Sequence, residues 1–176
     1  MQTSKKQQLS TKKLAVLALL STLALISFLI ESTLPVLFPY MPYAKLGVAN
    51  IFIMFAILVF GVKEGIIVAI TKLLLSAMIT GNIYGCLYSA CGLTLSILAL
   101  AILVKFDFTT IIGKSIISSV CFNAGQVLFA SVSLSQSLVA IMPLMLFCSL
   151  ISGGIIGIAI KIIINKLPIS FFVNLG

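Results

Sequence analysis

The sequence predicts an all-α integral membrane protein with six transmembrane helices and both termini in the cytoplasm. First, the 176 residues are 61% hydrophobic and only 8% charged, whereas a soluble domain carries about 25% charged residues. Second, the apolar runs approach the roughly 20 residues that a helix needs to cross a bilayer. Third, most lysines lie between these runs, on what becomes one side of the membrane.

The first predicted span covers 14–34 and follows a basic N-terminal tail, 1–13. It ends at Pro35, because proline cannot continue a regular helix. The apolar run passes signal-peptide length and continues into Glu31 and a proline cluster, without a small-residue cleavage pattern. We therefore expect a retained span.

The second and third spans are predicted at 46–60 and 65–80. A short polar turn, GVKEG at 61–65, separates them, and Lys72 interrupts the third span. The segment GNIYG at 81–85 then breaks the apolar pattern, because glycine and asparagine favour turns.

The last three spans are predicted at 86–104, 111–132 and 138–161. The uncharged stretch after Lys114 is too long for one helix, and SVSLSQS at 131–137 is its only polar break. All six spans belong to one transmembrane domain, 14–166, followed by a C-terminal tail, 167–176.

The distribution of lysines supports this order of spans. With the N-terminus inside, the cytoplasmic segments hold nine lysines: Lys5, Lys6, Lys12, Lys13, Lys63, Lys105, Lys114, Lys161 and Lys166. The outer segments hold only Lys45, and Lys72 lies within a span. Short cytoplasmic loops are enriched in positive charge, so we expect a multi-pass protein of the plasma membrane with both ends inside.

Composition also bears on the class of function. The net charge of +8 comes from lysines alone, and their place beside apolar spans favours a membrane surface over nucleic acid as the partner. The four cysteines form no CxxC pair and the chain has no histidine. We therefore expect no metal site and no intrinsic cofactor.

Polar residues within or beside the spans are the candidate site, because a bilayer makes them costly and they often serve function. Most of them fall in the outer half of the predicted bundle. They are Glu31, Lys45, Asn50, Lys72, Asn82, Tyr84, Asn123 and Gln126. Asn123 and Gln126 are three residues apart and share a helix face.

Each of these groups also has a structural alternative. Glu31 and Lys45 fit ordinary interfacial residues, and Lys72 fits a snorkelling lysine or a structural partner of Glu31. Asn123 and Gln126 fit hydrogen bonds to a neighbouring helix. Convergence on one side of the membrane favours a small-molecule site.

Small residues suggest helix contacts. A stripe in the first span recurs every three residues and fits packing inside the protein or against a partner helix; its members are Ala15, Ala18, Ser21 and Ala24. Gly153 and Gly157 form a GxxxG pair inside an apolar run, which permits close approach of another helix.

Three segments resemble a known family. PYAKLGVANI at 42–51 is similar to the PxAKLGLANI motif of the Gx transporter family, whose members are often labelled heptaprenyl diphosphate synthase component I. FGVKEG at 60–65, Lys72 and NAGQ at 123–126 continue the resemblance, which covers about 14–160.

The resemblance implies an S-component-like bundle, as in energy-coupling-factor transporters. Such proteins capture a vitamin-like molecule on the outer side and dock onto a shared transmembrane subunit with two ATPases. The implied function is a membrane-embedded binding or transport subunit for a vitamin-like, flavin or isoprenoid-type ligand. The stripe in the first span would contact the partner, although it departs from a strict AxxxA spacing.

The alternative is a non-catalytic membrane subunit that supports prenyl-quinone synthesis or extracytoplasmic flavin and quinone electron transfer. Its partner would be a prenyl synthase or an extracytoplasmic flavoprotein. Prenyl elongation needs Mg²⁺ on clustered carboxylates, but the chain has one Asp and two Glu, far apart in sequence. We therefore expect no enzyme, and any role in prenyl diphosphate synthesis would be accessory.

Overall fold

The structure, a computed structural model, describes residues 11–33, 45–107, 109–133 and 142–166. These residues form six helices: α1 Thr11–Thr33, α2 Asn50–Phe60, α3 Val62–Thr80, α4 Ile83–Phe106, α5 Ile111–Ser133 and α6 Met142–Lys166. The all-α prediction is confirmed for this part of the chain. Most of both tails, the 34–44 segment and the start of the predicted sixth span at 138–141 lie outside the described residues.

Four of the helices, α1, α4, α5 and α6, are long and apolar enough to cross a membrane. The other two differ from the predicted spans for physical reasons. Helix α2 has only 11 residues, because Gly47 has a φ of 84° and the helix begins after it. Helix α3 has 19 residues and includes Lys63, Glu64 and Lys72, which reduce its apolar character.

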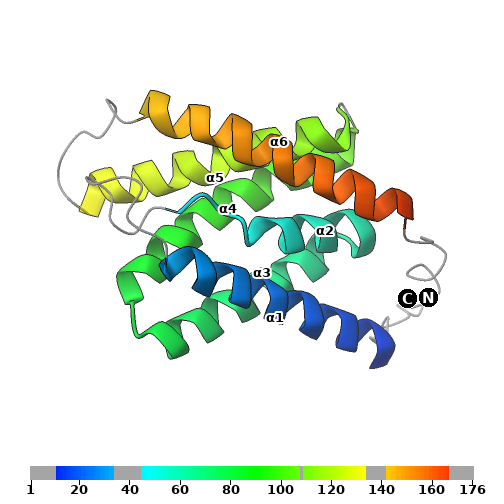
Figure 1. The fold of residues 1–176 in the computed structure, drawn as a ribbon, viewed down its shortest axis with the longest axis horizontal. Coiled ribbons are helices and arrows are strands. Elements are labelled where there is room, and N and C mark those ends of the chain that lie inside the picture. Colours follow the sequence, from blue (N-terminus) through cyan, green and yellow to red (C-terminus); the bar gives the residue numbers. More distant parts are fainter. Residues whose placement is uncertain (1–10, 34–44, 108, 134–141, 167–176) are drawn as a thin grey trace, which may run out of the picture.

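The helices form two groups of three (Figure 1). Helices α1, α2 and α3 pack on one another, α5 packs closely on both α4 and α6, and fewer contacts join the two groups. The main apolar core crosses between the groups. It includes Leu17 of α1, Ile53 and Ile57 of α2, Leu100 of α4 and Ile160 of α6.

Close approach of α4, α5 and α6 depends on residues with small side chains. A Cβ at Gly125 would lie 2.6 Å from the Cys91 carbonyl oxygen of α4. A Cβ at Gly153 or Gly157 of α6 would lie 2.8 Å from the Cα of a residue in α5. The predicted helix contact through Gly153 and Gly157 is therefore confirmed, with α5 as the neighbour.

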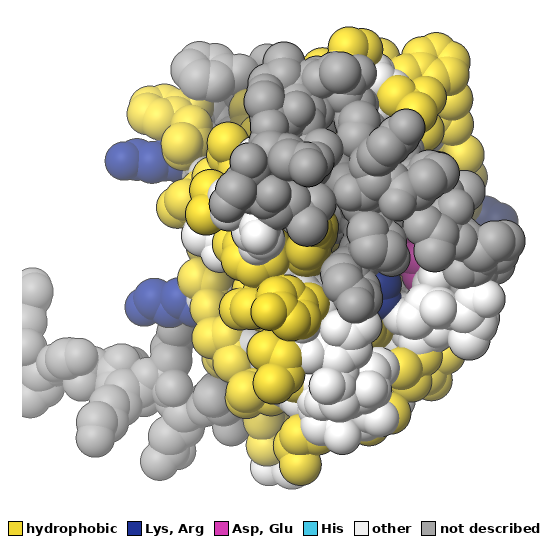
Figure 2. All heavy atoms as spheres, turned by 90° about the vertical axis from the view of Figure 1, so that its left-hand side faces the viewer, with side chains coloured by type: hydrophobic (Ala, Val, Ile, Leu, Met, Phe, Trp, Pro, Cys, Tyr) yellow, Lys and Arg dark blue, Asp and Glu magenta, His cyan; other side chains and the backbone are white. Residues whose placement is uncertain are grey.

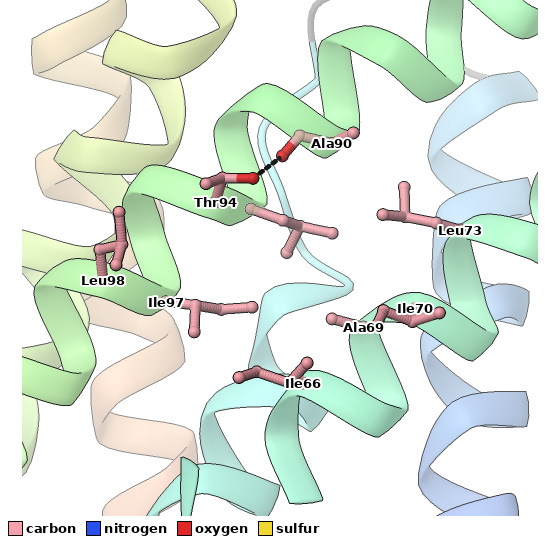
Figure 3. Close-up of a pocket in the computed structure, with 9 residues that line it drawn as sticks. Ile66, Ala69, Ile70, Leu73, Ala90, Thr94, Ile97 and Leu98 are labelled. Atoms are coloured by element: carbon pink, nitrogen blue, oxygen red, sulfur yellow. Dashed lines mark hydrogen bonds between the residues drawn. The ribbon is translucent and has the colours of Figure 1, made fainter. Parts of the chain in front are cut away.

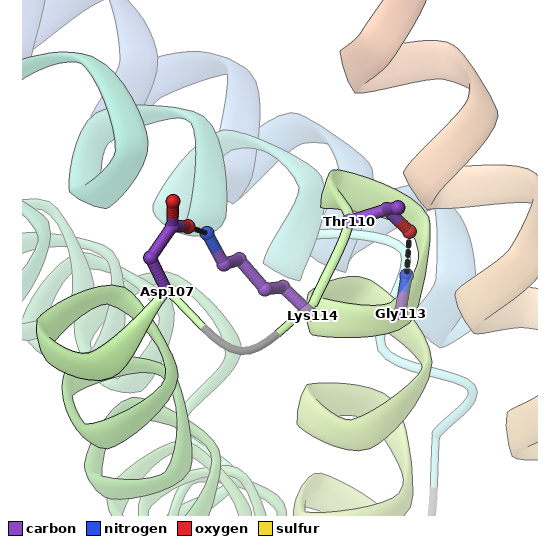
Figure 4. Close-up of polar contacts among 4 residues, drawn as sticks. All are labelled: Asp107, Thr110, Gly113 and Lys114. Atoms are coloured by element: carbon purple, nitrogen blue, oxygen red, sulfur yellow. Dashed lines mark hydrogen bonds and ion pairs between the residues drawn. The ribbon is translucent and has the colours of Figure 1, made fainter.

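One end of the bundle collects the basic helix ends. The α2–α3 and α4–α5 connections lie at the same end as the start of α1 and the end of α6 (Figure 1). Lys13 of α1 bonds to Glu64 of α3 at 2.8 Å. In the α4–α5 connection, Lys114 bonds to Asp107 at 2.5 Å and the Gly113 N–H donates to Thr110 (Figure 4). The bundle therefore has one lysine-rich end, and the opposite end carries the candidate site.

Candidate functional site

A buried charged cluster lies where α1, α3 and the segment before α2 meet. Glu31 and Phe28 come from α1, Lys72 from α3, and Lys45 from that segment. Lys72, Phe28 and Glu31 are almost fully buried. The Lys45 and Lys72 Nζ atoms lie 3.2 Å and 3.9 Å from the centre of the Phe28 ring. Both ammonium groups are thus close enough for cation–π attraction to one aromatic ring.

Local backbone geometry brings Lys45 and Glu31 together. The Gly47 N–H donates to Glu31 Oε1 at 2.9 Å. A Cβ at Gly47 would lie 2.9 Å from the Phe122 ring and 3.0 Å from Asn50 Nδ2, and its positive φ already favours glycine. The turn thus needs glycine on two counts, and it places buried Asn50 at the edge of the cluster.

The side chain and backbone of Lys45 contact different helix groups. Lys45 Nζ donates to Ser32 Oγ of α1, whereas its backbone N–H donates to Gln126 Oε1 of α5 at 3.0 Å. Residue 45 therefore links the two three-helix groups. On the face shown in Figure 2, an acidic and a basic side chain are visible beside each other.

The cluster holds two basic side chains and one acidic side chain. Burial lowers the pKa of Lys45 to about 8, although Glu31 and Cys86 oppose the shift. Desolvation disfavours a charged amine, and an unbalanced positive charge in a low-dielectric site attracts an anion. The arrangement therefore suits an anionic group.

Two buried amides on α5 lie on the other side of residue 45. Gln126 is fully buried and Asn123 is 1% exposed. Asn123 Nδ2 donates to Ser149 Oγ of α6 at 2.6 Å, and that hydroxyl donates to the Met145 carbonyl. Within the described part of the chain, Gln126 Nε2 and Asn123 Oδ1 have no hydrogen-bond partner. Buried polar atoms are nearly always paired, so these two need an explanation.

Two predicted site residues lie at the exposed start of α4. The Asn82 side chain accepts from the Gly85 N–H at 2.9 Å, which makes it the N-cap of this helix. Tyr84 is 60% exposed. The structure gives Asn82 a capping role and leaves the Tyr84 ring on the surface.

The predicted partner stripe on α1 is divided. Ala15 and Ala18 are exposed, whereas Ser21 and Ala24 are buried in the chain's own packing. A repeat of three residues falls 60° short of a full turn at each step, so the stripe winds around the helix. Ala15 and Ala18 alone are accessible to a partner.

Sequence reasoning missed three members of the site. Phe28 could have been found, because it lies three residues before Glu31 on the same face of the first span. Cys86 lies near enough to interact electrostatically with Lys45, and Ser149 holds the Asn123 amide. No sequence signal singles out Cys86 or Ser149 among the other cysteines and serines.

Two apolar cavities lie away from the cluster. One cavity, of about 310 Å³, lies between α3 and α4 and is lined by Ile66, Ile70, Leu73 and Ile97 among others (Figure 3). Another of about 280 Å³ lies between α4 and α5, beside Gly125 and Phe129. The Thr94 hydroxyl in the first cavity bonds to the Ala90 carbonyl of its own helix. Both cavities are lined mainly by apolar side chains, and none of the predicted site residues lines either of them.

Within the described residues, no group of three or more Cys, Asp or Glu side chains is arranged to hold a metal ion. Glu64 and Asp107 pair with lysines at the lysine-rich end, and Glu31 accepts from Gly47 at the other. The three carboxylates of the chain are therefore engaged separately.

Comparison with known families gives a match over most of the chain. The model of a family described as heptaprenyl diphosphate synthase component I matches residues 20–163. No curated protein and no solved structure matches this chain. The matched region includes every residue of the charged cluster and both α5 amides.

Proposed function

Because this chain belongs to the heptaprenyl diphosphate synthase component I family, we propose that it is a non-catalytic membrane subunit that binds an anionic small molecule. The observation that carries the proposal is the cluster of buried Lys72 and Glu31 with half-buried Lys45, in which two basic side chains share one carboxyl group. Charge-assisted hydrogen bonds to an anion are about twice as strong as neutral ones.

We propose the following arrangement in the membrane. Six helices cross the plasma membrane, with both termini in the cytoplasm and the charged cluster in the extracytoplasmic half. The lysine-rich end then faces the cytoplasm, as the positive-inside rule favours. Helix α2 crosses together with the residues before it, because 11 helical residues span only about 16 Å.

This topology is tested by labelling intact cells with a membrane-impermeant maleimide. Ile83→Cys and Lys63→Cys are each made in a background without the native cysteines. Position 63 is near the start of α3 and position 83 is at the start of α4, so the two thiols lie at opposite ends of the bundle, and both positions are exposed. Labelling of position 83 alone supports the proposed orientation. Labelling of position 63 alone reverses it.

The ligand proposal is tested by native mass spectrometry of protein purified gently from its own host. The wild type is expected to retain an anionic molecule of the vitamin-like, flavin or isoprenoid type, and Lys45→Met and Lys72→Met are expected to lose it. Lys161→Met is the matched control, because Lys161 is an exposed lysine near the end of α6. Equal retention in all three variants would rule out the charged cluster as the binding site.

The family description favours one alternative: an accessory role in prenyl-diphosphate or quinone synthesis. A diphosphate is also an anion, so both readings use the same cluster. The proteins that co-purify distinguish them: a transmembrane coupling subunit with ATPases indicates S-component-like transport, a prenyl synthase indicates the quinone role, and an extracytoplasmic flavoprotein indicates electron transfer. Ala15 and Ala18 are the proposed contacts on α1, because they are exposed.

A further inference from the structure

The two unpartnered amide atoms on α5 point to the chemistry of the neutral part of the ligand. Gln126 Oε1 already accepts from the Lys45 backbone N–H, so its amide orientation is fixed and Nε2 remains as a donor. Asn123 Nδ2 already donates to Ser149 Oγ, so Oδ1 remains as an acceptor. These two amides therefore present one donor and one acceptor of fixed identity.

The Ser149 hydroxyl determines which side of the Asn123 amide carries the nitrogen and which the oxygen. This hydroxyl donates its only proton to the Met145 carbonyl at 2.7 Å, so toward Asn123 it can only accept. The amide nitrogen must then face Ser149, and the oxygen must face away from it. A flipped Asn123 would place two acceptors against each other.

Helix geometry places Asn123 and Gln126 on the same face of α5. Residues three apart in a helix have Cβ atoms about 5–6 Å apart on one face. Both side chains are almost fully buried, and Gln126 bonds to residue 45, whose ammonium belongs to the charged cluster. Gln126 thus connects the α5 amides to the ammonium groups through residue 45, and Asn123 lies about one helical turn from Gln126.

Building on the proposed anion site, we propose that the ligand joins its anionic group to a polar ring edge that offers both a donor and an acceptor. Asn123 Oδ1 accepts from an N–H or O–H of that edge, and Gln126 Nε2 donates to a carbonyl or ring nitrogen. Lys45 and Lys72 hold the anionic end. A ligand that lacks the polar edge leaves two buried polar atoms unpaired, which costs affinity.

Two small probes separate the contributions. Orotate carries a carboxylate on a ring with adjacent N–H and carbonyl groups, whereas benzoate carries a carboxylate on a ring without them. Titration calorimetry of the purified full chain in mild detergent at pH 7 measures both dissociation constants. Two neutral hydrogen bonds predict that orotate binds about 30-fold more tightly than benzoate.

Variants assign this preference to the two amides. Gln126→Glu keeps an oxygen for the Lys45 N–H but replaces the donor with an acceptor, and Asn123→Leu removes the acceptor while keeping the branching of the side chain. Each is expected to reduce the orotate-to-benzoate ratio toward one. Because the ratio is measured within one variant, added charge or altered stability affects both probes alike. Elution as a single size-exclusion peak verifies folding.

The outcomes are distinct. A preference for orotate that both variants abolish, with Lys72→Met weakening both probes, supports the proposal. Equal binding of the two probes to the wild type, or a preference that survives both variants, overturns it while the anion site stands. Saturable binding of neither probe overturns the anion site and the polar-edge proposal together.

Discussion

The charge imbalance in the cluster predicts that its acidic and basic members respond oppositely to neutralisation. Glu31→Gln keeps an oxygen for the Gly47 N–H, which lies 2.9 Å away, and removes only the negative charge. Lys45 and Lys72 then both lie against the Phe28 ring without a carboxylate beside them. Lys72→Met leaves one ammonium with one carboxylate, and its thioether packs on Phe28.

The expected magnitudes follow from this count of charges. Leaving a buried charge without its partner costs about 3–5 kcal/mol, so Glu31→Gln should lower the unfolding midpoint by roughly 6–20 °C for a chain of this size. Lys72→Met should change the free energy of unfolding by less than about 1 kcal/mol, because replacing a buried charge while balance is kept is nearly neutral.

Thermal unfolding in mild detergent, followed by circular dichroism, measures both effects. The double variant Glu31→Gln/Lys72→Met should recover part of the loss, because only Lys45 then remains charged. A Glu31→Gln variant with the wild-type midpoint, or a double variant less stable than Glu31→Gln alone, would refute the charge-balance reasoning.

Three further predictions concern separate features. Gly125→Ala should cost about 1–3 kcal/mol of stability, because its Cβ would meet the Cys91 carbonyl; Gly154→Ala, where an added Cβ meets no atom within 4 Å, is the control in the same unfolding assay. Asn82→Ala should cost about 1 kcal/mol through loss of the α4 cap and leave the dissociation constant of the bound anion unchanged. Affinity for a carboxylate should fall as pH rises through about 8, where Lys45, surrounded by Glu31, Lys72 and Cys86, loses its proton. Lys45→Arg should remove that step in a pH titration, since arginine stays charged; a step that persists would assign it to another group.

Much of the helix order could be predicted from hydrophobic runs, because the bilayer imposes a length on each apolar segment. The start of α2 could not. The apolar pattern begins at Leu46, but Gly47 adopts a positive φ and its N–H binds Glu31. Because of that tertiary contact the helix begins only at Asn50. The local hydrophobic pattern does not predict this contact.

Part of the candidate site can also be predicted from the sequence. Polarity in an apolar context singled out Glu31, Lys45 and Lys72, and the structure brings them together. Phe28 shares a face of the first span with Glu31, but the two lysines that contact its ring come from other segments, so those contacts are visible only in the structure. Asn82 was selected for the same polarity, yet a helix end accounts for its side chain. Polarity identifies costly groups and does not distinguish a cap from a ligand contact.

The link between the two helix groups at residue 45 is made by a main-chain N–H. Replacing Lys45 with any residue that has a main-chain N–H removes the ammonium group and retains the hydrogen bond to Gln126. Proline alone among the natural residues lacks the donor. Substitutions at position 45 can therefore test two features separately. Alanine removes the charge and keeps the main-chain bond between the two helix groups, whereas proline removes that bond as well.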